Sequence, residues 1–509
     1  MRSKQFILFF AVLIAALCLR LSIASQGLTY LDRMFLPDDT YYTLSIARSL
    51  AAGAGPSASG EVLTSGFQPL TAFVMVPVYL LGAGLDAAVY ISILISALFG
   101  AVACALFALL IHHSTRSTPV AAVAGLLAVT SPLILRNDLN GLETSAAMAL
   151  SLASILLFVR LPERPSTTST AILGAFIGLM ILARVDTAVM ALLIGVSILA
   201  RFSIAPSAKT ALAALIVVSP WWAYCTLRFG SPVPESGAAV RQLITAAGDG
   251  RLSHMEDLRI AVTTLLGSLQ LNALPTPTGL ATLIAGALAT LIMAPRAKES
   301  LGVVTLILCG AIFTAFYVAY LPAFWFFHRY LHFVFFAVIA CAVVLPAFMF
   351  RNVPALRNSV ALGLGIFIIA LNIKGVLPFY SKPEGTMYGG VDGAKGYREV
   401  AQEILSAVPS GATIGSAQSG ALGYYADRGI SVVNLDGVVD RGAFNAIKSR
   451  SIADYIVGRK VGYIAGWQVN MIGLQQHSTA SSAKLHLMEV GRFKRQQGDQ
   501  FVLYTVTSN

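Results

Sequence analysis

Two neighbouring acidic residues, Asp38 and Asp39, are the first residues whose type and position suit them to chemistry. They stand in "LPDDTYYTLSIARSL", after a hydrophobic segment and directly after Pro37, which is favoured in the first turn of a helix. Acids at this place interact well with the helix dipole, and a carboxylate held there can take a proton from an attacking hydroxyl group. Neighbouring helical side chains project about 100° apart, so we expect one acid to be chemical and the other structural. The alternative is that both only cap the helix.

The residues after the two acids have the pattern of an amphipathic helix. Tyr42, Ile46 and the pair Ser49 and Leu50 follow one another at four-residue spacing, and Arg48 falls on another face. Such an apolar stripe is typical of a helix that lies in the plane of a membrane interface. This helix would hold the acids at the membrane surface.

More acidic residues occur in loops that we expect on the same side of the membrane. The stretch "RNDLNGLETSAAMAL" contains Asp138 and Glu143, and "ARVDT" contains Asp186. Grouping acids at a membrane interface costs desolvation and repulsion, which indicates a functional site. For Glu143 the alternative is a helix cap, and for Arg184 it is a simple ion pair with Asp186.

The composition is that of a membrane protein. Of the 509 residues, 56% are hydrophobic and 12% are charged, and the mean hydropathy is +0.75. These values are far from those of an ordinary soluble domain. The net charge of +11 comes mostly from the stretches between apolar runs, so it does not indicate binding to nucleic acid. The five cysteines lie inside apolar runs and show no metal-ligand spacing.

Eleven apolar runs are long enough, or nearly so, to cross about 30 Å of hydrocarbon. The first has no evident cleavage site, so we interpret it as an uncleaved span. The run 70–84 would reach only about 22 Å as a helix, and we interpret it as re-entrant or interfacial. With this count the cytoplasmic stretches hold eleven Lys and Arg against two Glu, which predicts a cytoplasmic N-terminus. The runs are 6–24, 87–111, 119–135, 145–160, 168–183, 187–201, 210–227, 276–294, 301–321, 328–349 and 359–377.

The chain after the last apolar run has a different pattern. It contains helix-like "YREVAQEILSAV", strand-like "ATIGSA", "ISVVNLDG" and "VGYIAGW", and alternating "FVLYTVT", joined by short turns. We predict an α-helical polytopic membrane protein with about eleven transmembrane helices and a small C-terminal α/β domain outside the cytoplasm. The membrane module would span 1–377, with the acids in its outer loop 25–68, and the α/β domain 378–509. Asp427, Asp436 and Asp440 are expected to be turn acids only.

Five fragments of the sequence resemble, in their order, the GT-C superfamily of membrane glycosyltransferases. After an apolar first span come "PDDTYYTLSIARSLAAGAGPSASGEVLTSGFQPL", "NGLETSAAMAL", "LARVDTAVMAL", "RFGSPVPES" and "HRYL". Together they cover roughly residues 1–440 and are similar to bacterial aminoarabinose, protein O-mannosyl and arabinofuranosyl transferases. The resemblance implies a polyprenyl-phosphate sugar donor and a glycan, lipid or protein acceptor in the cell envelope. It also implies transfer with inversion at the outer face of the plasma membrane.

The resemblance implies roles for individual residues as well. It places the catalytic carboxylate at Asp38 or Asp39, and we expect Asp38 to be the base. The leaving phosphate needs a cation, and Arg329 in "FWFFHRYLH" is the first candidate because a guanidinium matches phosphate oxygens. The alternative is that Arg329, Tyr330 and also Tyr317 are interfacial anchors. The candidate substrate-binding residues are Arg329, Tyr330, Glu143, Arg184 and Tyr42.

Metal dependence and two other functions are left open by the sequence. His328 and His332 alone do not make a metal site, and a decisive Asp-x-Asp motif is missing, so no cofactor is predicted and a divalent cation stays an open alternative. A transporter of lipid-linked sugars or polysaccharide, or a non-catalytic protein that binds a lipid-linked sugar, would have a similar composition. The charges inside predicted spans, Arg20, Arg329 and Lys374, lie toward outer ends, which favours surface chemistry over a transport path. No motif identifies the sugar or the acceptor.

Overall fold

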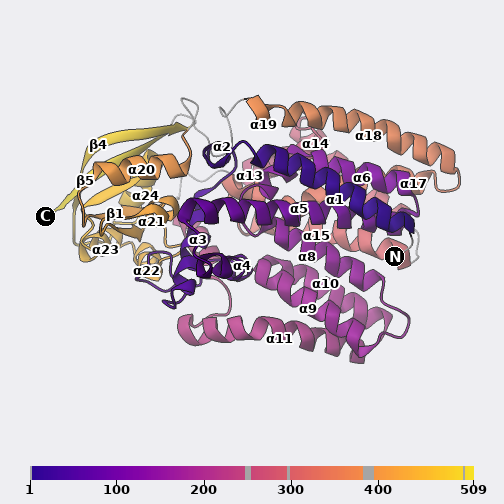
Figure 1. Cartoon of the computed structure of the whole chain (residues 1–509), viewed down its shortest axis with the longest axis horizontal. Helices are drawn as coiled ribbons and strands as arrows, with labels where there is room; N and C mark the ends of the chain where they lie inside the picture. The colour runs from indigo at the N-terminus through magenta and orange to yellow at the C-terminus, as the bar shows by residue number, and fades with distance from the viewer. Residues whose placement is uncertain (1–2, 247–253, 295–297, 382–394, 497–498) are drawn as a thin grey trace.

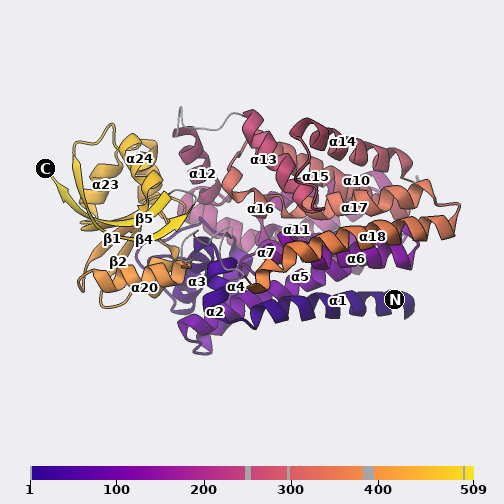
Figure 2. The same ribbon diagram turned by 90° about the horizontal axis from the view of Figure 1, so that it is seen from above.

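The protein consists of a helical bundle that carries an α/β domain at one end (Figure 1). The structure is a computed structural model and describes residues 3–246, 254–294, 298–381, 395–496 and 499–509. The long helices run side by side, and the N-terminus lies at the end of the bundle opposite to the α/β domain, as Figures 1 and 2 both show.

Each of the eleven predicted spans forms a helix or a pair of helices in the described residues. In the part of the chain that the structure describes, seven helices are long and apolar enough to cross a membrane, and an eighth span results if α6 and α7, bent by 63° at the break between them, are counted as one. The other three, α8, α9 and α10, have 16, 17 and 14 residues. The bundle helices are α1 (Ser3–Ala24), α5 (Leu85–Thr115), α6 (Thr118–Thr130), α7 (Pro132–Asp138), α8 (Thr144–Val159), α9 (Thr167–Ala183), α10 (Ala188–Arg201), α11 (Ile204–Phe229), α14 (Thr276–Met293), α15 (Leu301–Ala319), α17 (His332–Met349) and α18 (Pro354–Val376).

The basic loops gather at the end of the bundle that holds the N-terminus. The Gln5 amide near the start of α1 contacts the His112 ring at the end of α5, at 3.4 Å. The next residue after α5, Arg116, pairs with Glu299 at 2.6 Å. The α/β domain occupies the other end of the bundle.

The first long loop forms three helices: α2 (Leu28–Met34), α3 (Asp38–Ala51) and α4 (Pro69–Leu80). Helix α4 has only 12 residues, in keeping with the interpretation of 70–84 as a segment too short to span. The prediction that α3 presents an apolar stripe to a membrane interface is wrong. Tyr42 and Ile46 are buried, because α4, α5 and the α/β domain pack around this helix.

The α/β domain is built on a five-stranded sheet in the order β2-β1-β3-β5-β4. Strand β1 (Thr413–Ser416) pairs in parallel with β2 (Ser431–Asn434) and β3 (Tyr463–Trp467), whereas β5 (Asp499–Ser508) is antiparallel to β3 and β4 (Leu485–Gln496). The predicted helix and four predicted strands are present, and β4 was not predicted. The division at residue 377 stays a prediction. The helices are α20 (Tyr397–Ala407), α21 (Gly420–Tyr425), α22 (Arg441–Lys448), α23 (Ile452–Gly458) and α24 (Gln468–Gln476).

Ion pairs fix the α/β domain to the bundle. Glu399 on α20 pairs with Arg33 on α2 at 2.5 Å, and Arg398 pairs with Asp86 in the first turn of α5 at 2.5 Å. The carboxylate of Asp32 accepts the backbone N–H of Arg398 at 3.0 Å. The domain therefore sits directly over the segment that contains the two adjacent acids.

A buried ion pair ties the first helix to the same end of the bundle. The guanidinium of Arg20 on α1 donates to Asp138 on α7 from Nη2 and, at 2.9 Å, from Nε, and the two side chains are 0% and 1% exposed. Removing one partner of such a pair leaves a charge in a low-dielectric site, whereas removing both leaves none.

We expect Asp138→Asn to lower the free energy of unfolding by about 3–5 kcal/mol. Adding Arg20→Met to that variant should restore most of the loss. Thermal unfolding of the detergent-solubilised protein measures both. Arg116→Met is the matched control, because its pair with Glu299 is exposed and such pairs contribute about 1 kcal/mol or less. A cost of Asp138→Asn no larger than that of the control would contradict the prediction.

Candidate active site

The predicted site residues converge where the bundle meets the α/β domain. They come from the start of α3, the loop before α8, the short helix η1 (Val185–Thr187), the end of α15, α16 (Phe327–Tyr330) and the first turn of α17. These segments are far apart in the sequence, and the packing of α8, α15 and α17 against α5 brings them together.

Asp39 and Arg329 form an ion pair at the centre of this region. The Nη1 of Arg329 lies 2.6 Å from Oδ2 of Asp39, and the side chains are 9% and 31% exposed respectively. The guanidinium also lies over the rings of Phe326 and Tyr330, at 4.8 and 5.6 Å from their centroids. Asp39 is thus the more accessible of the two adjacent acids. It lies beside Arg329, which was predicted from the sequence to bind the donor phosphate.

Asp38 is used differently from its neighbour. Its side chain is buried, and its two oxygens accept the backbone N–H groups of Gly420 at 2.7 Å and Ala421 at 2.8 Å, in the first turn of α21. Burial raises the pKa of Asp38 to about 7, although the two N–H groups favour its charged form. A pKa near neutrality would suit a base, but geometry comes first, and both oxygens are already occupied. Asp38 therefore joins α3 to the α/β domain.

Gly420 has to be a glycine for this joint to close. A Cβ atom at Gly420 would lie 2.2 Å from the carbonyl oxygen of Asp38 and 2.9 Å from its carboxylate. Both contacts are shorter than van der Waals contact, and one is with backbone.

We expect Gly420→Ala to force α21 away from α3 and to lower the melting temperature by several degrees, since overpacking costs about 1–3 kcal/mol. Gly423→Ala on the same helix is the control, because its Cβ would meet nothing closer than 3.8 Å. Differential scanning fluorimetry in detergent compares the two variants. Equal melting temperatures would contradict this account of the joint.

Arg184 forms the hub of a second cluster. It pairs with Glu143 at 3.0 Å and with Asp186 at 2.7 Å, and it donates to the Tyr317 hydroxyl at 3.2 Å. The Tyr317 hydroxyl in turn donates to Asp186, and its ring stacks on Tyr330 at 4.6 Å. The alternative that Glu143 is a helix cap is not supported, because it makes no side-chain cap bond. The interpretation of Tyr317 as an interfacial anchor is wrong, because its side chain is buried within this cluster.

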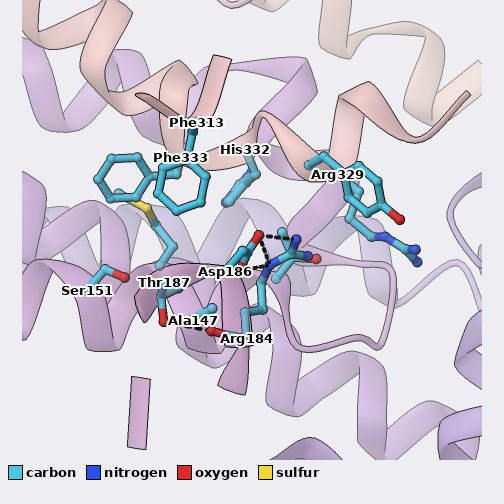
Figure 3. A pocket seen from close by; sticks show the side chains of 12 residues that line it. Ala147, Ser151, Arg184, Asp186, Thr187, Phe313, Arg329, His332 and Phe333 are labelled. Carbon is cyan, nitrogen blue, oxygen red and sulfur yellow. Dashed lines mark hydrogen bonds and ion pairs between the residues drawn. The ribbon is translucent and has the colours of Figure 1, made fainter. Parts of the chain in front are cut away.

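A pocket connects the two clusters (Figure 3). The free space in and around it is about 310 Å³, open solvent at its mouth included. Arg184, Asp186 and Arg329 reach it from different segments, and His332, Phe313 and Phe333 line the wall formed by α15 and α17. The complete lining is Thr144, Ala147, Met148, Ser151, Arg184, Asp186, Thr187, Phe313, Arg329, Tyr330, His332 and Phe333.

Tyr42, a predicted substrate-binding residue, lies toward the α/β domain rather than in the lining of this pocket. Its hydroxyl donates to the carbonyl of Ala417 at 3.0 Å and accepts the backbone N–H of Ser419 at 3.2 Å. Asp436 accepts the N–H of Val438 at 2.8 Å, and Asp440 caps α22, which are contacts expected of turn acids.

The carboxylates around the pocket do not make a metal site. Among the residues that the structure describes, no group of three or more His, Cys, Asp or Glu side chains could hold a metal ion. Asp39 is paired with Arg329, Glu143 and Asp186 share Arg184, and Asp38 is bound to backbone N–H groups. Among the described residues, each of these carboxylates is thus engaged by a partner within the chain.

The sequence reasoning missed Thr144, Ser151 and the wall residue Phe313. A signal for two of them was present: Thr144, Ala147, Met148 and Ser151 follow the spacing of one helix face. This spacing was not interpreted as a site because α8 is apolar and small hydroxyl residues are common in membrane helices.

Comparison with known proteins identifies the fold. No protein-family model and no curated protein matches the sequence. The structure is similar to that of ArnT from Cupriavidus metallidurans bound to undecaprenyl phosphate, with a TM-score of 0.53 and 13% identity, covering 99% of this chain and 98% of ArnT. It is also similar to the Archaeoglobus fulgidus oligosaccharyltransferase in complex with Zn and sulfate, with a TM-score of 0.50 and 14% identity, covering 89% and 67% of the two chains.

The class that these features define is a polytopic, α-helical membrane protein with a C-terminal α/β domain. Within this class, the chain shares its overall fold with these two solved structures, in keeping with the resemblance of its motifs.

Proposed function

We propose that this protein is an inverting glycosyltransferase that moves a sugar from a polyprenyl-phosphate donor to an acceptor hydroxyl group. The observation that carries the proposal is the ion pair between Asp39 and Arg329 beside the pocket, in a chain with the GT-C fold. A base and a phosphate ligand are the two groups that this transfer needs.

Arg329 would bind the phosphate of the donor. Its guanidinium is only 9% exposed and already stands in a carboxylate contact, and it can make the same kind of paired hydrogen bonds to phosphate oxygens. The solved structure of ArnT with undecaprenyl phosphate supports a lipid phosphate as the carrier group. The lipid tail would reach the site laterally between helices.

Asp39 would act as the base. When the donor phosphate engages Arg329, it competes for the guanidinium and frees the Asp39 carboxylate for the acceptor. The acceptor oxygen then attacks the anomeric carbon, and its proton passes to Asp39. The bond between the anomeric carbon and the phosphate oxygen breaks, its electron pair goes to that oxygen, and the products are the glycosylated acceptor and polyprenyl phosphate. Attack opposite the leaving group inverts the anomeric centre.

The other clusters would hold this pair in place. Asp38 fixes the first turn of α3 through its bonds to α21, so that the α/β domain sets the position of Asp39. Arg184 pairs with Glu143 and Asp186 and, together with Asp186, holds the Tyr317 hydroxyl by hydrogen bonds. The Tyr317 ring stacks on Tyr330, which is next to Arg329. Both are positioning roles, since these groups are occupied by partners within the chain.

The position of the basic loops supports an extracytoplasmic site. Lys and Arg are retained on the cytoplasmic side of the plasma membrane, and the basic loops lie at the end of the bundle opposite to the pocket. The pocket and the α/β domain would therefore face outward, where cell-envelope glycans, lipids and proteins are available as acceptors.

The experiment that tests the function is a transfer assay with wild-type protein. Membranes that contain the protein and matched membranes without it receive a pool of radiolabelled polyprenyl-phosphate sugars, and the label is followed into acceptor and water-soluble fractions. Label moved only in the presence of the protein supports the proposal. No transfer above the empty membranes from any donor would contradict it.

A further inference from the structure

Three buried polar groups in the pocket lack the partners that such groups normally have. The hydroxyl of Thr144, the hydroxyl of Ser151 and both ring nitrogens of His332 make no hydrogen bond within the described part of the chain. All three residues line the pocket between the Arg184 cluster and Arg329, and they are 3%, 1% and 2% exposed. An unpaired buried polar group is costly, so such a cluster indicates a missing hydrogen-bonding ligand.

The hydroxyl of Ser151 lacks a bond that several other hydroxyl residues in the bundle helices make. A serine or threonine inside a helix ordinarily donates to the carbonyl four residues earlier. Ser154, three residues further along the same helix, does so to Leu150 at 2.8 Å, and Thr290 and Thr314 do the same on α14 and α15. Ser151 does not, and its hydroxyl is presented to the pocket.

The rest of the lining is aromatic or apolar. The rings of Phe313 and Phe333 lie 5.4 Å apart at an interplanar angle of 39°, and Met148 and Tyr330 complete the wall. Figure 3 shows His332 directed into the space between Phe333 and Arg329. The site thus combines non-ionic hydrogen-bonding groups with flat apolar surface. A neutral imidazole offers one donor and one acceptor, and each hydroxyl offers both.

We infer that this pocket holds the sugar ring of the donor and that Thr144, Ser151 and His332 form hydrogen bonds to its hydroxyl groups. The inference rests on the proposed function and deepens it. A sugar carries hydroxyls that both donate and accept, and apolar C–H faces that pack on aromatic rings, which is the combination the lining offers. A polyprenyl tail offers no hydrogen bonds and would leave the three groups unpaired.

The test compares two ligands on the purified full-length protein in detergent. Binding of bare undecaprenyl phosphate is measured beside binding of undecaprenyl phosphate that carries a single hexose or pentose. The variants are Thr144→Val and Ser151→Ala, which remove one hydroxyl each, and Ser151→Leu, which fills the pocket. Ser154→Ala is the matched control, because its hydroxyl is bonded within α8 and lies outside the pocket lining.

The expected result is selective for the sugar. Thr144→Val and Ser151→Ala should weaken binding of the glycosylated lipid about 3- to 10-fold each, and Ser151→Leu more than about 10-fold. Binding of bare undecaprenyl phosphate should change less than about 2-fold. The melting temperatures of Thr144→Val and Ser151→Ala should be unchanged or higher, because an orphan polar group has been removed. The control should leave both affinities unchanged.

Three outcomes would overturn the inference. Wild-type protein that binds bare and glycosylated lipid equally tightly, or variants that weaken both ligands alike, would show that the pocket takes lipid or phosphate rather than sugar. Variants without effect on either ligand would exclude Thr144 and Ser151 as sugar ligands. Failure of the wild-type protein to bind any polyprenyl phosphate is a separate result, because it would overturn the proposed function itself.

Discussion

Replacing Asp39 with asparagine is expected to lower the turnover of glycosyl transfer by roughly 10²- to 10⁴-fold, the contribution of a general base. The amide has nearly the same shape as the carboxylate but cannot accept the acceptor's proton. Binding of bare undecaprenyl phosphate should be retained or become tighter, since Arg329 then has no carboxylate partner in Asp39 to compete with the phosphate. Single-turnover transfer and lipid binding on the same purified sample separate these two effects.

Two comparisons make this prediction specific. Asp427→Asn changes an acid that is 66% exposed and pairs with its neighbour Arg428, so it should leave transfer unchanged. Asp38→Asn can keep only part of the contact with α21, and we expect it to weaken the joint with a melting temperature below that of the wild type. Transfer by Asp39→Asn within about 3-fold of the wild type would remove Asp39 as the base. Loss with Asp38→Asn alone, at an unchanged melting temperature, would move the base to Asp38.

Arg329→Gln is expected to lower kcat/KM by roughly 10²- to 10³-fold, the typical effect of removing a group that stabilises developing charge. It should also weaken binding of bare undecaprenyl phosphate, because the guanidinium is the proposed phosphate ligand. Arg329→Lys should recover only part of the loss, since an ammonium group is a point charge without the paired donors of arginine. Transfer kinetics and lipid binding are the measurements.

The control for this variant is an arginine in a similar pair away from the pocket. Arg459 pairs with Glu61 at 2.6 Å between the first loop and the α/β domain, and Arg459→Gln should leave lipid binding unchanged. Arg184→Gln should affect lipid binding less than Arg329→Gln, because Arg184 is already bonded to Glu143 and Asp186. The opposite order of the two effects would place the phosphate at Arg184 instead.

The joint between Asp38 and α21 bears on how the site opens. A chain that binds a membrane lipid and a second substrate needs access to the pocket, and the α/β domain is fixed over α3 by Asp38 and by the pairs Arg33 with Glu399 and Arg398 with Asp86. Gly420→Ala, which separates α21 from α3, is therefore expected to alter transfer as well as stability, because Asp39 is the next residue after the displaced contact.

Local sequence patterns were sufficient to predict the helices and strands and to predict that basic loops and acidic loops lie at different ends of the bundle. Apolar runs of membrane length, the basic loops and the alternating strands are properties of neighbouring residues, so eleven helical runs and four of the five strands could be predicted. The acids of the first loop, Glu143, Arg184 and Arg329 were also selected from short motifs. Strand β4, LHLMEVGRFKRQ, was not predicted.

The partners of these residues were decided only by the tertiary structure. The sequence favoured Asp38 as the base, yet the fold binds it to the backbone of α21 from the other end of the chain and leaves Asp39 beside Arg329, 290 positions away. The covered face of α3, the burial of Tyr317 and the unpaired hydroxyl of Ser151 depend likewise on helices that meet only in the folded bundle. Residue type and spacing determine which groups are available at a helix end, because they act over a few residues. Which of two adjacent carboxylates stays accessible depends on long-range packing, since burial and hydrogen bonding to distant backbone are absent until the chain has folded.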